Sequence, residues 1–348
     1  MGVGFRTLRS TKLHLGRPRP LVGDNEGSPT REPITTRFLT DTDTAGDDVT
    51  SMLFGLLWPS VALEAVTVCC GNVYLEQATR NALYTVELAG RPEVPVYAGA
   101  PRPLVRDLVT AHYVHGTDGM GGANFPDPAP SLAEGHAAGA IIELSHRHAG
   151  ELEIIAQAPL TNIALALLLD PGLPSRVRRL WVMGGSNNRL GNITPAAEFN
   201  FYVDPEAAHV VLAAGFELTL VPWDLCVDFG ILLREELQPV LDMKTKLAEF
   251  YLQVNSGAWE FMRTHIEGAS VDGISHPDSL MMAMAIEQNL ILESRKCFVD
   301  VEYSSELTRG YSLVDLNHVL HKEPNATVVT RVDKDGFKKM LFELLRAS

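Results

Sequence analysis

The chain has 348 residues, 46% of them hydrophobic, and a formal net charge of −14. This length allows a large core in one or two domains, whereas the acidic balance argues against a nucleic-acid-binding protein, which would normally carry a basic face. No apolar run approaches the ~20 residues that a membrane-spanning helix needs.

Cysteine usage indicates the cellular compartment. The chain has four cysteines, of which Cys69 and Cys70 are adjacent, and it contains no Cys-x-x-Cys pair. A disulfide framework or a zinc cluster is therefore not expected. Reduced thiols are typical of a cytoplasmic protein, which is the location that we expect.

Residues 1–35 differ from the rest of the chain. They contain no acid before Asp24, several arginines and many Gly and Pro residues, and they show no sustained apolar periodicity. The stretch lacks the apolar region of a secretory signal, and Arg6 stands where a myristoylation signal has Ser or Thr. Its basic start weakly resembles an organelle transit peptide, but a flexible extension is the favoured interpretation. The predicted domain therefore covers residues 36–348.

From Thr36 onward, short apolar runs rich in β-forming residues alternate with segments of helical periodicity. In chain order the prediction is strand 36–40, helix 46–58, strand 63–70, helix 74–90, strand 94–99, helix 131–148, strand 152–158, helix 159–169, strand 178–185, helix 204–215, strand 217–223, helices 233–243, 247–266 and 278–288, strands 296–303 and 326–333, and helix 334–347. This alternation predicts a single α/β domain with an open, mostly parallel, Rossmann-like sheet and helices on both faces.

Polar residues follow five of the predicted strands. They are the four-Asp loop after 36–40, Gly71-Asn72, Gln157 with Thr161-Asn162, Gly184-Gly185 and Trp223-Asp224. In an open parallel sheet, ligands bind at the carboxyl ends of the strands. We therefore expect these loops to converge on one crevice, although Thr161-Asn162 lies in a first helical turn and is assigned a structural role.

The segment "LTDTDTAGDDVTSM", residues 39–52, places four carboxylates close together. Asp47 and Asp48 could simply start a helix, where carboxylates complement the helix dipole. That role leaves Asp41 and Asp43 unexplained. Calcium binds about 6–8 oxygen ligands, and the loop contains no His or Cys to favour zinc or copper. The loop therefore predicts a hard-cation site.

Two known loop motifs match this segment less well. An EF-hand begins D-x-D-x-[DN]-G and has Glu at its twelfth position, but the fifth position here is Ala45 and the twelfth is Met52. A phosphatase loop of the D-x-D-x-[TV] type, as in haloacid dehalogenase-like enzymes, would need Thr or Val in place of Ala45. It also gives no role to the pair Asp47-Asp48, so it remains the weaker alternative.

Six segments together resemble a known family. With its glycine one place later than the common spelling, "DTDTAGDD" resembles the D-x-D-x-G-x-D-D-type signature of the inosine–uridine-preferring nucleoside hydrolases. The other segments resemble that family in the same order: "TVCCGNVYLEQATRNAL", "HGTDGMGG", "QAPLTNIALAL", "GNITPAAEFNFYVDPEAA" and "SHPDSLMMAMAI". The resemblance runs from about Phe38 to the C-terminus.

The resemblance implies the nucleoside hydrolase fold and a reaction. The reaction is calcium-dependent hydrolysis of the N-glycosidic bond of ribonucleosides, which yields ribose and a free nucleobase. By the same resemblance, Asp43 is the general base and binds the calcium ion together with Asp47, Asp48, Asp278 and the backbone carbonyl of Gln157.

The resemblance also implies substrate-binding residues and partners. Positions matched to ribose binding are Asn72, Asn192, Glu198 and Asn200, positions near the nucleobase are His115 and Phe199, and Asp41 matches an acid buried behind the metal ligands. The implied partner is a small-molecule nucleoside, with no nucleic acid or membrane. A homo-oligomer, either a dimer or a tetramer, is also implied.

Bond cleavage needs an activated water, a hold on the sugar and a protonated or stabilised leaving base. Asp43 can accept the proton of the water. Many family members have His directly before the last Asp ligand, but here Pro277 occupies that position and His276 lies one residue earlier. We predict His276 as the leaving-group acid, although the shift can turn its side chain away. The other candidates are His115, Tyr251, Trp259 and His265, and Trp223 is either a base-stacking or a core residue.

Two other functions remain open. One is a non-catalytic member of the family that binds ribose or a nucleoside, which would require loss of the general base or of a ligand. None of these residues is missing from the sequence. The other, less favoured, is the Asp-loop phosphatase.

Overall fold

The computed structural model describes residues 35–264 and 270–347. The predicted N-terminal extension, apart from Thr35, lies outside the described residues, and so does the candidate acid His265.

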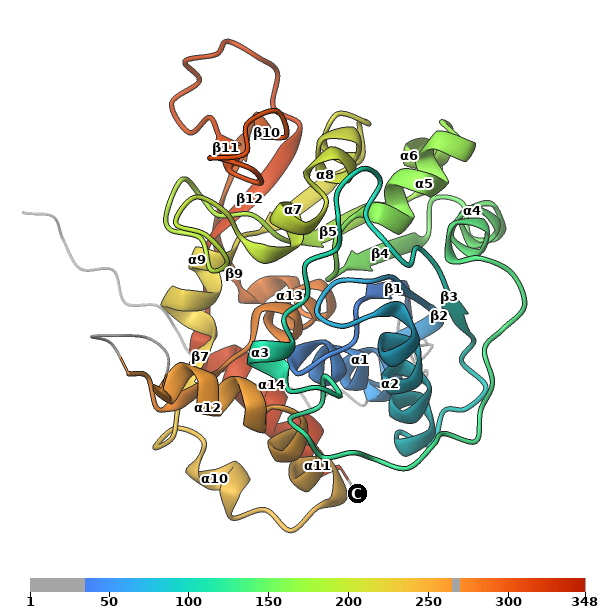
Figure 1. Ribbon diagram of the computed structural model, residues 1–348, viewed down its shortest axis with the longest axis vertical. Helices are drawn as coiled ribbons and strands as arrows, with labels where there is room; N and C mark the ends of the chain where they lie inside the picture. Colours follow the sequence, from blue (N-terminus) through green and yellow to red (C-terminus); the bar gives the residue numbers. More distant parts are fainter. Residues whose placement is uncertain (1–34, 265–269, 348) are drawn as a thin grey trace, which may run out of the picture. The chain divides into compact units, whose positions relative to one another are not determined.

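Eight strands form the central sheet, in the order β3-β2-β1-β4-β5-β6-β12-β9 (Figure 1). Their bounds are β1 (Thr36–Thr42), β2 (Val61–Val68), β3 (Val96–Ala98), β4 (Leu152–Ala156), β5 (Arg179–Met183), β6 (Leu218–Val221), β9 (Ile291–Cys297) and β12 (Ala326–Val332). Neighbouring strands are parallel except β12 and β9, which are antiparallel. The predicted α/β fold with an open, mostly parallel sheet is confirmed.

The order of the strands changes direction beside β1. The chain passes from β1 to β2 and β3 on one side, then returns to β4 and continues through β5 and β6 on the other side. Ligands bind at the carboxyl ends of the strands at such a switch point. The loops after β1, β2 and β4, which carry the acidic loop, Asn72 and Gln157, meet there.

Helices cover both faces of the sheet, and each face has its own core. Because successive strand residues point to opposite faces, Phe38 packs into one core and Leu39 into the other. The first core is covered by α1 (Asp47–Leu57), α2 (Leu75–Leu88), α11 (Lys246–Val254), α13 (Pro277–Ile286) and α14 (Lys334–Arg346). The second core is covered by α4 (Ala137–Arg147), α5 (Thr161–Leu169), α6 (Leu173–Arg176) and α8 (Pro205–Leu212).

The remaining elements are short. They are α3 (His112–His115), α7 (Phe199–Val203), α9 (Trp223–Leu225), a π-helix (Cys226–Gly230), α10 (Gln238–Leu241), α12 (Ser256–Thr264), a 3-10 turn (Gln288–Leu290), and the antiparallel pairs β7 (Ile231–Leu233) with β8 (Gly273–Ser275) and β10 (Val299–Val301) with β11 (Ser312–Val314). Within residues 35–264 and 270–347, no helix combines the length and the apolar character needed to cross a membrane.

The helix predicted over 131–148 begins later than expected. It starts at Ala137, because Gly135 adopts a φ of 103° and the chain cannot be helical there. The side chain of His136 then caps the helix by accepting a hydrogen bond from the N–H of Ala138 (3.1 Å). Residues 131–136 therefore form a loop.

Three other predicted elements differ from the structure. The helix predicted over 233–243 is wrong, because the chain forms β7 and then the one-turn helix α10, which has Pro239 in its first turn. The helix predicted over 247–266 is divided into α11 and α12 at Asn255. The strand predicted over 296–303 is divided between β9 of the central sheet and β10 of a separate pair.

Truncating Phe337 on α14 should destabilise the fold. This side chain is fully buried in the first core. We expect Phe337→Ala to lower the free energy of unfolding, measured by urea denaturation, by about 3–5 kcal/mol because it leaves a cavity. Glu343→Ala, at an exposed position of the same helix, is the matched control and should change that free energy by no more than about 0.5 kcal/mol. Equal effects of the two substitutions would contradict the packing.

Candidate active site

The four aspartates of the acidic loop are buried at the carboxyl end of β1. Asp41 and Asp43 are 0% exposed, Asp48 is 1% exposed and Asp47 is 6% exposed. The chain enters α1 through Gly46, whose φ of 45° is easily reached only by glycine. As predicted, Asp47 and Asp48 occupy the first turn of that helix.

Asp41 contacts structural groups. It accepts hydrogen bonds from the hydroxyl of Thr67 (2.6 Å) and the side-chain amide of Asn162 (2.8 Å). Burial raises the pKa of Asp41 to about 7, and the two hydrogen bonds oppose that rise. Asn162 also accepts a hydrogen bond from the N–H of Ala100 (2.9 Å), which agrees with the structural role predicted for it.

Asp47 joins α1 to the N-terminus of α13, which lies far along the chain. One carboxylate oxygen accepts hydrogen bonds from the N–H groups of Asp278 (2.8 Å) and Ser279 (2.9 Å), and the other accepts one from the Ser279 hydroxyl (2.7 Å). Burial raises the pKa of Asp47 to about 6, and the bonds from Ser279 limit the rise. The structure thus brings Asp278 to the acidic loop.

Asp48 is the most extensively hydrogen-bonded of these acids. Its carboxylate accepts hydrogen bonds from the Thr42 hydroxyl (2.8 Å), the Ala45 N–H (3.2 Å), the Asn72 side-chain amide (3.1 Å) and the Gln157 side-chain amide (3.1 Å). Burial raises its pKa to about 6, and most of these bonds oppose the rise. Asp48 therefore connects the loops that follow β1, β2 and β4.

Asp43 carries an unpaired buried oxygen. Its Oδ2 accepts a hydrogen bond from the N–H of Asn72 (2.5 Å), whereas its Oδ1 has no hydrogen-bond partner in the described residues. Burial, followed by the negative charge of the neighbouring Asp48, raises the pKa of Asp43 well above its usual range. Burial and the charges of Asp48, Asp47 and Asp43 do the same to the pKa of Asp278.

The donor chemistry of this acidic cluster fits a hard cation. In the described part of the chain, Asp43, Asp47, Asp48 and Asp278 form no ion pair with Arg, Lys or His. No three Asp, Glu, His or Cys side chains among the described residues are already arranged as a metal site, and several of these oxygens are hydrogen-bonded to the protein. The oxygen-only set and the unpaired Oδ1 of Asp43 still match Ca²⁺ far better than zinc or copper.

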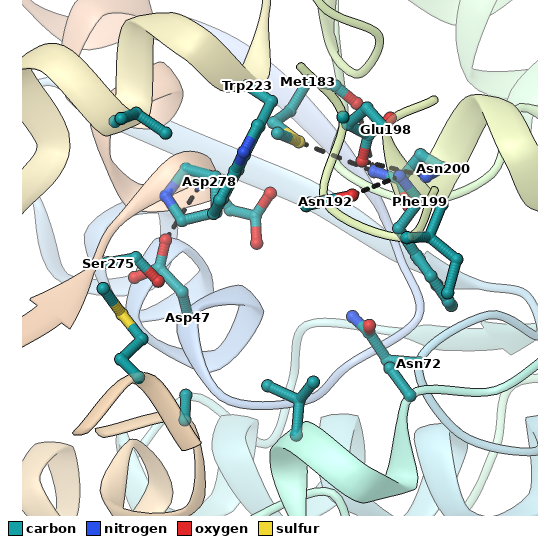
Figure 2. Close-up of a pocket in the computed structure, with 18 of the residues that line it drawn as sticks. Asp47, Asn72, Met183, Asn192, Glu198, Phe199, Asn200, Trp223, Ser275 and Asp278 are labelled. Carbon is teal, nitrogen blue, oxygen red and sulfur yellow. Dashed lines mark hydrogen bonds between the residues drawn. The ribbon is translucent and has the colours of Figure 1, made fainter. Parts of the chain in front are cut away.

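A cavity of about 1130 Å³ opens at this edge of the sheet. The predicted site residues that line it are Asp47, Asp48, Asn72, His115, Gln157, Asn192, Glu198, Phe199, Asn200 and Asp278, whereas Asp43 and His276 do not line it. Figure 2 shows Asp47 and Asp278 facing the space from one side and Glu198 and Asn200 facing it from the other. The acidic loop, Asn72, Gln157 and Trp223-Asp224 all contribute to the wall, so the predicted convergence of these loops is confirmed.

Glu198 shapes the wall opposite the acids. It caps α7 by accepting hydrogen bonds from the N–H groups of Asn200 (2.9 Å) and Phe201 (3.2 Å), and it also accepts one from the N–H of Gly185 (2.8 Å). Burial raises the pKa of Glu198 to about 7. The fifth polar cluster, Gly184-Gly185, thus contributes by holding this carboxylate.

The two asparagines on either side of Glu198 are also fixed. Asn192 Oδ1 accepts a hydrogen bond from the N–H of Phe199 (2.8 Å). The Asn200 amide donates to the backbone carbonyls of Met183 (3.1 Å) and Gln157 (3.4 Å). The Gln157 carbonyl, which the resemblance assigned to a metal ion, therefore points toward Asn200 here.

His276 is fully buried, and both of its ring nitrogens have partners. Nδ1 contacts the Gly230 carbonyl (2.9 Å), which can only accept, so Nδ1 carries the proton and Nε2 accepts from the hydroxyl of Tyr251 (2.7 Å). Burial lowers the pKa of His276 to about 4. This geometry does not favour His276, or the equally buried Tyr251, as the acid that protonates the leaving base, and that role stays a prediction.

The other candidates for the leaving-group acid or for base stacking differ in whether they line the cavity. Trp259 donates to Asp272 (2.7 Å) and does not line the cavity, whereas Trp223 and His115 do. Burial lowers the pKa of His115 to about 4. Asn255, another cavity residue, is not predicted from the sequence, because a single polar residue between helical segments gives little signal.

Comparisons with known proteins identify the family of this chain. Residues 38–339 match the family described as inosine-uridine preferring nucleoside hydrolase. An uncharacterized protein of Schizosaccharomyces pombe is 36% identical over 312 residues, which is 89% of this chain and 98% of that protein. The pyrimidine-specific ribonucleoside hydrolase RihA of Escherichia coli is 32% identical over 316 residues, with the same coverage.

A solved structure shares the fold. The plant nucleoside hydrolase PpNRh1 superposes with a TM-score of 0.84 and 28% sequence identity, over 91% of this chain and 100% of that one. The chain belongs to the inosine-uridine preferring nucleoside hydrolase family and is a ribonucleoside hydrolase, an N-glycosyl hydrolase.

Proposed function

We propose that the enzyme hydrolyses ribonucleosides with a Ca²⁺ ion held by the carboxylates of Asp43, Asp47, Asp48 and Asp278, with the backbone carbonyl of Gln157 as a further ligand. The observation that carries the proposal is the burial of these four carboxylates without an Arg, Lys or His partner among the described residues. Removing a single ion from water costs several kcal/mol unless it is compensated. A cluster of four must therefore take up protons or bind a cation, and oxygen ligands of this kind suit calcium.

The chemistry divides between the ion and the protein. When bound, the cation lowers the pKa of a water and helps to orient the sugar hydroxyls. Asp43 accepts the proton of the attacking water at Oδ1, the oxygen that has no other partner among the described residues.

The amide-rich wall positions the ribose. Asn72, Asn192 and Asn200 present side-chain amides to the cavity, and Glu198 presents a carboxylate between them. Backbone groups hold the side chains of Asn192, Glu198 and Asn200, and the Asp48 carboxylate holds the Asn72 amide. Orientation alone can supply up to roughly 7–11 kcal/mol of a barrier. The nearby carboxylates also offset the positive charge that develops on the sugar as the C–N bond breaks.

Substrate range, assembly and location complete the proposal. Membership of the family favours hydrolysis over the two alternatives, the phosphatase and the non-catalytic binding protein. One relative is named pyrimidine-specific, so the substrate panel should include both pyrimidine and purine ribonucleosides. We propose a cytoplasmic location, which the four free and buried cysteines support. We also propose a dimer or tetramer, which rests on the family resemblance.

Asp43→Ala should remove the general base. We expect kcat, followed by release of reducing sugar from ribonucleosides, to fall by about 10²–10⁴-fold or more. Asp127→Ala is the matched control, because the Asp127 side chain is 93% exposed and pairs only with Arg80 in the described residues. A variant at Asp43 that keeps a tenth of the wild-type rate would sink the proposed mechanism.

Removing calcium should weaken both activity and stability. Treatment with a chelator followed by gel filtration should abolish hydrolysis, and added CaCl₂ should restore it. The ion binds only the folded chain, so calcium should also raise the midpoint of thermal unfolding. The rise corresponds to about 2.7 kcal/mol of added stability when the free calcium concentration is about 100 times the dissociation constant. Asp278→Asn should lose most of this calcium-dependent rise. Full activity after chelation would contradict the metal assignment.

The role of His276 can be tested by varying the leaving group. A leaving-group acid matters for inosine and uridine but not for p-nitrophenyl riboside, whose leaving group departs without a proton. The buried geometry predicts that His276→Gln lowers kcat for all three substrates by a similar factor. A loss confined to the nucleosides, about 10²-fold or more, would instead establish His276 as the acid.

A further inference from the structure

Asn255, where α11 ends, has one half of its side-chain amide fixed and the other half free. It is 1% exposed and lines the cavity. Its Nδ2 donates to the backbone carbonyl of Tyr251 (2.9 Å) and contacts the hydroxyl of Thr50 (3.2 Å). A carbonyl can only accept, so this contact fixes which end of the amide is nitrogen. The opposite atom, Oδ1, has no hydrogen-bond partner among the described residues.

A second unpaired polar atom lies close to it. His115 belongs to α3, lines the same cavity, and its Nδ1 has no hydrogen-bond partner within the described ranges. A Cβ placed on Gly46 would lie 2.6 Å from His115 Nδ1 and 3.9 Å from Asn255 Oδ1. Two segments far apart in the sequence therefore bring unpaired polar atoms together above the N-terminus of α1, where the absence of a side chain on Gly46 leaves the space.

These atoms need a partner that the described protein does not supply. A buried acceptor without a hydrogen bond is unfavourable by about 1–3 kcal/mol, and such atoms are uncommon in folded proteins. Asn255 and His115 both line the ligand cavity, so a ligand that enters it is the natural partner of these two atoms. The wall residues proposed to hold the ribose come from other segments, namely the loop after β2, residues 192–198 and α7, so Asn255 and His115 remain available to contact the nucleobase.

We propose that Asn255 is a specificity-determining residue whose Oδ1 accepts a hydrogen bond from an N–H group of the nucleobase, with His115 Nδ1 as a second polar contact. This inference rests on the proposed nucleoside-hydrolysing function of the same cavity. An amide oxygen only accepts, so a base must offer a donor. The ring N–H of uracil or hypoxanthine and the exocyclic amino groups of other bases meet that requirement.

The test compares substrates that differ in that donor. Uridine is paired with 3-methyluridine, and inosine with purine riboside, which lacks the N–H. We expect wild-type kcat/KM to favour the donor-bearing member of a pair by about 10–100-fold, because an unpaired buried acceptor is left with the other member. Asn255→Leu keeps the side-chain size, and it should remove most of this preference while lowering the rate for the donor-bearing member more than for its analogue.

Gln253→Leu is the matched control, because it removes an exposed amide from the same helix, and it should leave the preference as in the wild type. A preference that persists in Asn255→Leu would overturn the inference and assign Oδ1 to a bound water. Equal wild-type rates within both pairs would also overturn it, without any variant having to fold. Failure of the wild type to hydrolyse every nucleoside in the panel would contradict the proposed function instead.

Discussion

The structure must hold four carboxylates of like charge close together and away from water. Asp43, Asp47, Asp48 and Asp278 are all buried at one edge of the sheet, where each charge would be unfavourable alone and more so beside the others. Hydrogen bonds offset only part of this, since burial still raises the pKa of every member. A bound cation is the one addition that would stabilise all four as carboxylates, and the same cation would serve the hydrolytic reaction.

The fold meets this constraint by bringing distant segments to the switch point of the sheet. The acidic loop follows the central strand β1, and α13 returns near the end of the chain so that its first N–H groups bind Asp47. Asp47 therefore serves α1 as a first-turn acid and α13 as a capping acceptor. Asp48 accepts hydrogen bonds from Asn72 and Gln157 in the loops that follow the neighbouring strands β2 and β4. The amide-lined wall of the cavity and the acidic cluster therefore share hydrogen bonds.

The parts of the site that sequence predicts well are local in origin. The acidic loop and its helix follow from a strand, a glycine and an acidic first turn, and the cavity residues after β2 and β4 follow from the rule for parallel sheets. His276 was harder, because a single-residue shift before Pro277 decides whether its ring faces the cavity or the Gly230 carbonyl. Asn255 was missed, because its significance lies in contacts with Tyr251 and Thr50 that no spacing reveals. The short helix α7 is too brief to show periodicity and depends on the Glu198 cap.

The central claim is that the buried acids form a calcium site, and direct titration calorimetry of the metal-free protein tests it most directly. If the acids form a calcium site, Ca²⁺ binding is saturable with a stoichiometry near one ion per chain. Protons are released on binding because carboxylates of raised pKa ionise, and Asp48→Asn loses the binding. Nucleoside hydrolysis by a protein that binds no calcium in this titration would contradict it.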